Sequence, residues 1–115
     1  MRCALILALL AATASAAPAP TTCGLPDGYS KALCAYQRRN FDEAEAGFRA
    51  IVNADVQDPR TVRATYFLAR TLMKRGRYDE AGSLFIRIYT MDKSFYDAWS
   101  CDYLLGICRR ATGKD

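Results

Sequence analysis

The chain repeats itself at one fixed spacing, and this spacing restricts the fold more than any other feature. Residues 41–48, FDEAEAGF, return as residues 78–85, YDEAGSLF, a shift of 37 positions. Tyrosines recur with the same shift at Tyr29, Tyr66 and Tyr103. A period of this length is typical of arrays of helix pairs, in which each unit buries its apolar face against the next unit.

The spacing of the apolar residues predicts five helices and no strand, because no stretch alternates apolar and polar residues between hairpin turns. Small residues recur with the helices, at Ala32, Ala69 and Gly106. The first helix is expected from a cap at Asp27 or Ser30 to Arg38, and the second from Asp42 to a loop at 55–59. The third is expected from Pro59 to Gly76, and the fourth from Tyr78 to a turn at 93–95. The last should begin between Asp97 and Cys101 and end just before 113–115.

The first residues are typical of a signal for export. Arg2 precedes an apolar run over residues 4–12 that is too short to span a membrane, and residues 14–16 have the small-x-small pattern of a cleavage site. The sequence therefore predicts three parts: a signal peptide over 1–16, a lead-in with Cys23 over 17–27, and a helical domain over 28–115.

The composition excludes several classes of function. The net charge of +4 is too mild for a nucleic-acid footprint, and no second apolar run is long enough for membrane insertion. The chain has no histidine, which excludes most zinc sites and the usual nucleophile–base pairs of hydrolases. We therefore expect no metal, no cofactor and no catalytic residue.

The cysteines fit an oxidising compartment. Removal of Cys3 with the signal peptide leaves an even set, Cys23, Cys34, Cys101 and Cys108, and small exported domains often pair such sets in disulfides. We favour Cys23 with Cys34, which ties the lead-in to the first helix. Cys101 with Cys108 follows by elimination, on the condition that Cys101 lies before the last helix or distorts its first turn. A folded-back array that joins the two ends is the rival arrangement.

These residues resemble the tetratricopeptide repeat. That family has a Leu-Gly step in the first helix of each unit, a Gly-x-Tyr turn, and Ala-x-x-x-Phe in the second helix. The matching residues are Leu68-Ala69 and Leu105-Gly106, Gly76-Arg77-Tyr78, Ala44 with Phe48, and Ala81 with Phe85. The resemblance implies an α-α superhelix, a right-handed helical solenoid of about two and a half repeats, with units longer than the usual length of about 34 residues.

Similarity to this family also implies a binding groove lined by the first helix of each unit. The residues carried over to that groove are Tyr29, Tyr36, Arg63, Tyr66, Arg70, Met73, Lys74, Tyr103 and Arg110. Three tyrosines at one repeat position with basic residues between them would suit an acidic peptide or a C-terminal carboxylate. The alternative is that each tyrosine is half-buried packing and each arginine a solvated charge.

We therefore interpret the chain as a noncatalytic protein-binding adaptor, exported to the periplasm or else secreted. Its partner would be a protein or peptide. A short array has an uncovered end, so self-association into a homo-oligomer is a further expectation. The alternatives are a protein with thiol–disulfide activity and a secreted effector on the same helical scaffold. Cys-x-x-Cys pairs are absent, which disfavours the thiol–disulfide alternative.

Overall fold

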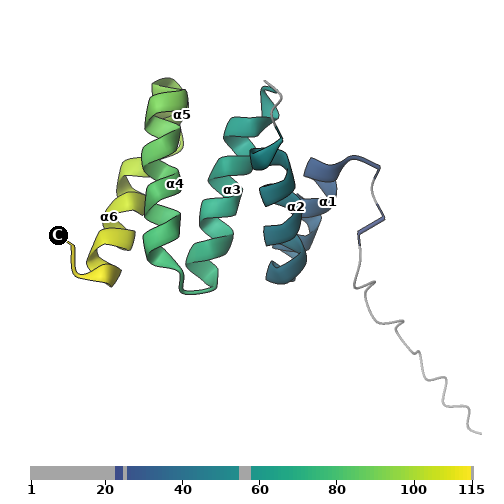
Figure 1. Cartoon of the computed structure of the whole chain (residues 1–115), viewed down its shortest axis with the longest axis horizontal. Helices are drawn as coiled ribbons and strands as arrows, with labels where there is room; N and C mark the ends of the chain where they lie inside the picture. Colours follow the sequence, from purple (N-terminus) through teal and green to yellow (C-terminus); the bar gives the residue numbers. More distant parts are fainter. Residues whose placement is uncertain (1–22, 25, 55–57, 115) are drawn as a thin grey trace, which may run out of the picture.

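The computed structural model describes residues 23–24, 26–54 and 58–114, and all regular structure in them is α-helical. Six helices follow one another along the chain (Figure 1). Their bounds are α1 Gly28–Gln37, α2 Phe41–Asn53, α3 Arg60–Lys74, α4 Tyr78–Met91, α5 Lys93–Ala98 and α6 Cys101–Thr112. The all-α prediction is therefore confirmed.

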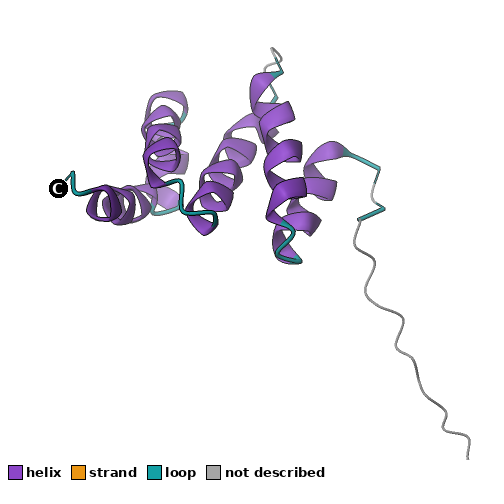
Figure 2. Cartoon of the chain, turned by 60° about the horizontal axis from the view of Figure 1, so that its bottom comes forward, coloured by secondary structure: helices purple, strands orange, loops and turns teal. Residues whose placement is uncertain are grey.

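The helices stand side by side in a single curved row. α1 and α2 form one antiparallel pair and α3 and α4 a second, and each helix packs on the next along the chain (Figures 1 and 2). α6 packs on α4 at the far end of the row, and the short α5 lies between these two helices in the sequence. The described structure thus contains two complete helix pairs, the short α5 and a further helix, α6, as expected for two and a half units apart from the additional α5.

The two helix pairs turn at equivalent residues. Arg39 has a φ of 64° and Gly76 a φ of 79°, so both lie in the left-handed region just after a first helix. The amide of Asn40 donates to the carbonyl of Ala35 at 2.8 Å, and the same six-to-one bond recurs one unit later at 2.9 Å, between Arg77 and Leu72. The turn is therefore repeated in its backbone as well as in its sequence.

The core of each pair is also repeated. Phe48 and Phe85 are fully buried, and each ring meets the tyrosine of its own first helix edge-on. The centroids of Tyr29 and Phe48 are 6.0 Å apart, and those of Tyr66 and Phe85 are 6.2 Å apart. Both phenylalanines are thus buried against the tyrosine at the same offset, which confirms that the sequence repeat is a structural one.

A close approach fixes the distance between α1 and α2. A Cβ added at Gly47 would lie 2.7 Å from the Cβ of Ala32, which is too near for two carbon atoms. Ala32 and its counterpart Ala69 are almost completely buried. The small residue in the first helix therefore lets the second helix pack closely, as the motif predicts.

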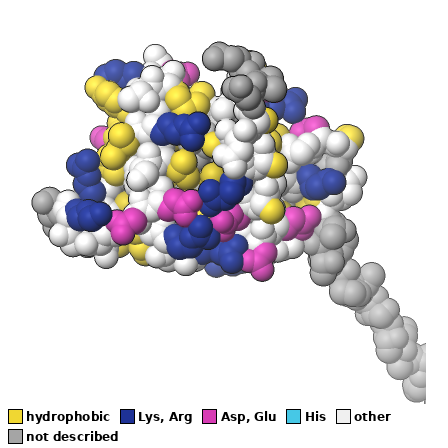
Figure 3. Space-filling view, viewed as in Figure 1, with side chains coloured by type: hydrophobic (Ala, Val, Ile, Leu, Met, Phe, Trp, Pro, Cys, Tyr) yellow, Lys and Arg dark blue, Asp and Glu magenta, His cyan; other side chains and the backbone are white. Residues whose placement is uncertain are grey.

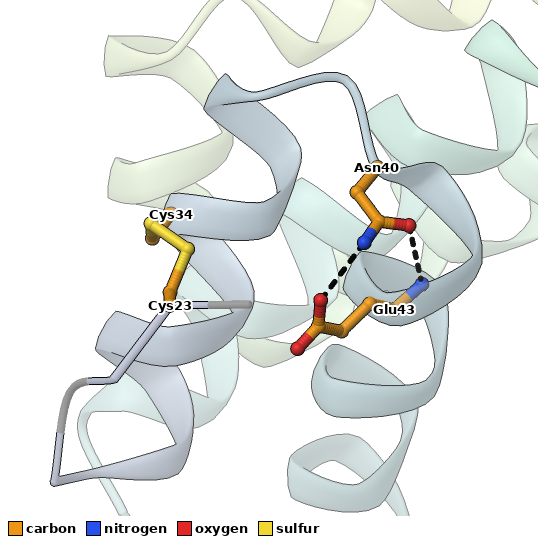
Figure 4. Close-up of a disulfide and its surroundings, with 4 residues drawn as sticks. All are labelled: Cys23, Cys34, Asn40 and Glu43. Atoms are coloured by element: carbon orange, nitrogen blue, oxygen red, sulfur yellow. Dashed lines mark hydrogen bonds between the residues drawn. A yellow bond between two sulfur atoms is a disulfide. The ribbon is translucent and has the colours of Figure 1, made fainter. Parts of the chain in front are cut away.

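Caps and a disulfide position the first pair (Figure 4). Asn40 accepts a hydrogen bond from the Glu43 amide and donates one from its own side-chain amide to the Glu43 carboxylate at 2.9 Å. Cys23 is bonded to Cys34, with their Cα atoms 6.0 Å apart. The favoured pairing of these two cysteines is confirmed, and it ties the lead-in to the first helix.

The expectation of five helices and a turn at 93–95 is wrong, because α5 occupies that segment. The carboxylate of Asp92 accepts the amide of Phe95 at 3.0 Å and caps the new helix. Ser100, at a φ of 54°, then turns the chain into α6. The extra length of the unit is therefore folded rather than left as an open loop.

The expected disulfide between Cys101 and Cys108 is also wrong. Both are free, buried thiols within α6. Residues seven apart in one helix are separated by about 10.5 Å along its axis, which a disulfide cannot bridge. Cys101 begins the helix regularly, so the condition for that bond is not met.

The predicted signal peptide, 1–16, and most of the lead-in lie outside the described residues. Within the described part, none of the helices has the length and apolar character required to cross a bilayer.

Candidate groove on the first helices

Charges of opposite sign are segregated between the first and second helices of the pairs. α1 and α3 carry basic residues and no acidic ones, whereas α2 and α4 carry acidic residues in their first turns. The basic residues of α1 and α3 are Lys31, Arg60, Arg63, Arg70 and Lys74. The face formed by the first helices is therefore positive, which favours an anionic partner.

An aromatic cluster lies between α1 and α3. At its centre is Phe67, whose ring centroid is 5.6 Å from that of Tyr36, 6.5 Å from that of Tyr29 and 5.7 Å from that of the buried Phe48. Tyr29, Tyr36 and Phe67 are all half-buried, so they combine packing with exposed ring surface. We did not predict a role for Phe67, because its counterparts at the repeat spacing are not aromatic.

The cluster continues onto the end of α5. Trp99 lies 6.2 Å from Phe67 and 4.9 Å from Tyr66, and Phe95 stacks on Trp99 at 4.6 Å. As a result, Tyr66 is only 7% exposed. The chain's own α5 thus covers the tyrosine that was expected at the middle of an open groove.

Two arginines of α3 lie over these rings. The guanidinium of Arg63 is 5.7 Å from the Trp99 ring centroid, and that of Arg70 is 5.8 Å from the Tyr66 centroid. Arg70 also donates to the Tyr66 hydroxyl at 2.8 Å. Neither arginine forms an ion pair with a carboxylate in the described part of the chain. Their charges are therefore available to a ligand.

Burial and a nearby charge both act on the pKa of Tyr29. Burial raises the pKa of its phenol, and the nearby guanidinium of Arg63 partly opposes that rise. The phenol therefore stays neutral at physiological pH. It can donate or accept a hydrogen bond at the edge of the aromatic cluster.

The remaining predicted groove residues are divided between two places. Met73 is half-buried and Lys74 exposed in the last turn of α3, near the basic and aromatic face. Tyr103 and Arg110 lie on α6, and Tyr103 is 65% exposed with no ring contact to another described residue. The structure therefore brings Tyr29, Tyr36, Arg63, Tyr66 and Arg70 together, and it leaves Tyr103 and Arg110 on a separate helix.

The basic residues after α3 do not belong to this face. Arg75 and Arg77 both bond the Glu45 carboxylate, at 3.1 Å and 2.9 Å. Arg49 bonds the same carboxylate and also Glu80, so the network joins the two helix pairs. Figure 3 shows positive and negative side chains clustered along the lower edge, where Figure 1 places the α3–α4 turn.

Other candidate sites are weak. The described residues contain no group of three potential metal ligands. A small cavity of about 110 Å³ lies between α4 and the end of α6, lined by Gly82, Leu105 and Thr112 among others. The face of α1 and α3 therefore combines several half-buried rings with two arginines that form no ion pair among the described residues.

Comparison with known proteins agrees with this architecture. A family model described as tetratricopeptide repeat matches residues 29–94, which is more than half of the chain. No curated protein and no solved structure gives a significant match. The matched segment contains both complete helix pairs with their repeated turn, alanine and phenylalanine positions. The chain belongs to the tetratricopeptide repeat family.

Proposed function

We propose that this chain is a noncatalytic adaptor that binds an extended, acidic peptide segment of a partner protein across α1 and α3. Its family supports this role, because tetratricopeptide repeat domains generally act as protein–protein interaction modules and are typically noncatalytic. The observation that carries the proposal is the coincidence of a positive face with half-exposed aromatic rings on these two helices.

The aromatic rings provide the contact area of the site. Tyr36, Phe67 and Trp99 are each half-buried, so their orientations are fixed before a ligand arrives. Rigid rings give a large contact area at a low cost in conformational entropy. They suit apolar or aromatic side chains spaced along an extended peptide.

The arginines provide the charge selection. The guanidinium groups of Arg63 and Arg70 are held over rings and have no carboxylate partner among the described residues. A peptide carboxylate placed beside them would gain charge-assisted, bidentate hydrogen bonds. A basic peptide would instead be repelled.

The covering of Tyr66 by α5 limits the length of the site. Phe95 and Trp99 close the face on the α5 side. The peptide would therefore lie over α1 and α3 and end at Trp99, without reaching Tyr103 and Arg110 on α6.

We further propose that the protein is exported, to the periplasm or as a secreted protein. The pattern of residues 1–16 supports export, and so does the Cys23–Cys34 bond, because disulfides persist in oxidising compartments. A secreted effector could use the same peptide-binding face.

Thiol–disulfide activity is the weaker alternative. Burial raises the pKa of the Cys101 thiol to about 11 and also raises that of Cys108. Reactive cysteines have lowered pKa values and accessible sulfur atoms, and these two thiols have neither.

Trp99 offers a direct assay, because it is the only tryptophan in the chain and lies at the edge of the site. Its emission should change on titration with acidic ten-residue peptides that contain an aromatic residue, and not with lysine-substituted peptides of equal length. Arg63→Glu should weaken this binding about tenfold or more, the expected cost of losing a charged hydrogen bond and adding repulsion.

Arg87→Glu is the matched control, since Arg87 is an exposed arginine on α4, away from the proposed site. It should leave the affinity nearly unchanged. Equal loss in the two variants would indicate a general charge effect and would overturn the site. Failure of every acidic peptide to bind, together with a measured enzymatic rate, would overturn the function.

A further inference from the structure

α6 has the character of a first helix whose second helix is not present in the described structure. Gly106 is the counterpart of Ala32 and Ala69, which are 1% and 0% exposed beneath the helix that follows them. Gly106 remains partly exposed. A Cβ added there would meet only a guanidinium nitrogen of Arg110, at 3.9 Å. The position that brings two helices together in the complete pairs is thus uncovered on α6.

The uncovered face carries opposite charges at its two ends. Asp102, Gly106 and Arg110 are spaced by four residues and so form one ridge along α6. Neither Asp102 nor Arg110 forms an ion pair within the described part of the chain. Tyr103 lies beside this ridge with 65% of its surface exposed. Figure 1 places α6 at the free end of the row of helices.

We propose that α6 of a second copy of this chain packs antiparallel on this face, about a two-fold axis at Gly106. The second α6 would take the place that α2 and α4 occupy in the complete pairs. Those pairs are antiparallel too, and in the first of them the closest approach is also between two small residues, Ala32 and Gly47. Two Gly106 residues facing one another would allow axes about 8 Å apart, at the short end of helix packing distances.

Charge complementarity favours a second copy of α6 as the partner and an antiparallel orientation of the two helices. In an antiparallel pair centred on Gly106, Asp102 of each chain faces Arg110 of the other, so two ion pairs form at equal distances from the axis. A parallel pair would place Asp102 against Asp102 and Arg110 against Arg110. The arginine that folds over Gly106 in the single chain would move to the opposing carboxylate. The exposed Tyr103 would then lie beside Arg109 and Arg110 of the second copy, within reach of a cation–π contact.

The interface is small, which sets its expected strength. One pair of twelve-residue helices buries less than the roughly 1,200–2,000 Å² of stable complexes. We therefore expect a reversible dimer with a dissociation constant on the order of tens of micromolar, measurable by sedimentation equilibrium.

A charge-exchange experiment tests both the face and its direction. Asp102→Arg alone and Arg110→Asp alone should each be monomeric, because like charges then meet twice. An equimolar mixture of the two variants should recover dimers, since every contact in the mixed pair is again between opposite charges. Lys31→Glu, an exposed charge reversal on α1, is the control and should dimerise like the unaltered chain.

A second variant distinguishes a loss of dimerisation from a loss of folding. Gly106→Leu has room for its Cβ in the single chain, and leucine favours helix more than glycine does, so its melting temperature should not fall. It should nevertheless weaken dimerisation at least tenfold. An unaltered chain that stays monomeric at millimolar concentration would overturn the proposal, and so would a mixture that gains no dimer or a Gly106→Leu variant that dimerises normally.

Discussion

Neutralising Glu45 should weaken the contact between the two helix pairs. Its side chain is 14% exposed and accepts from Arg49 at 2.8 Å, from Arg75 at 3.1 Å and from Arg77 at 2.9 Å. Exposed ion pairs contribute about 0.2–1 kcal/mol each, and hydrogen bonds to a charged group about 1.5–3 kcal/mol when buried. Because the arginines are one-third exposed or more, we expect Glu45→Gln to lower the free energy of unfolding by about 1–2 kcal/mol at neutral pH.

The loss of stability in Glu45→Gln should become smaller as the pH falls. Burial alone would raise the pKa of Glu45, but hydrogen bonds from Arg49 and Arg77 outweigh it and hold the pKa below its ordinary value of 4.5. A carboxyl whose pKa is lowered by folding adds stability above its unfolded pKa and loses it as the pH falls through the folded pKa. The difference in the free energy of unfolding between the unaltered chain and Glu45→Gln should therefore be full at pH 7 and vanish at a pH well below 4.5.

Urea unfolding followed by circular dichroism at both pH values measures this difference. Asp97→Asn is the matched control, because the ion pair of Asp97 with Lys93 is about 60% exposed on both sides. That control should cost less than about 0.5 kcal/mol at either pH. A Glu45→Gln penalty that is equally large at acid pH would refute the electrostatic reasoning and point to packing.

Other changes test the packing and the lead-in, each by urea or thermal unfolding. Gly47→Ala should destabilise by about 1–3 kcal/mol because its Cβ would clash with α1, whereas Gly82→Ala should be neutral or stabilising, since its Cβ would meet ordinary contacts at 3.5 Å. Gly76→Ala should lower the free energy of unfolding by about 1 kcal/mol, because alanine is strained at a positive φ. Arg39→Gly should lower it by nothing, because glycine adopts the positive φ of the equivalent turn without strain. A larger loss for Arg39→Gly than for Gly76→Ala would contradict the equivalence of the two turns. Cys34→Ser should lose about 2–3 kcal/mol through its 11-residue loop, with no further loss on adding reductant.

The repeated parts of the fold could be predicted from the sequence because residues at equivalent positions of the two units are expected to have the same secondary structure and burial. Phe48 and Phe85 occur in the same motif, and each is buried against the tyrosine at the same offset. The turns at Arg39 and Gly76 follow the same rule despite their different residues.

The parts that occur once could not be predicted in this way. At the repeat spacing, α5 corresponds to residues 56–61, around the loop predicted from the sequence at 55–59, so the repeat gave no reason to expect a helix there. Its rings then cover Tyr66 and complete the aromatic cluster around Phe67, which has no aromatic counterpart. The even number of cysteines led us to expect a disulfide between Cys101 and Cys108, but two cysteines at these positions within one helix cannot form it.

The central claim is that the protein binds an acidic peptide over α1 and α3. Nuclear magnetic resonance of the isotope-labelled chain, titrated with the best acidic peptide, tests it most directly. The claim predicts that the largest shifts fall on Arg63, Phe67 and the single indole N–H of Trp99. Shifts confined to α2 and α4, with the indole signal unmoved, would contradict it.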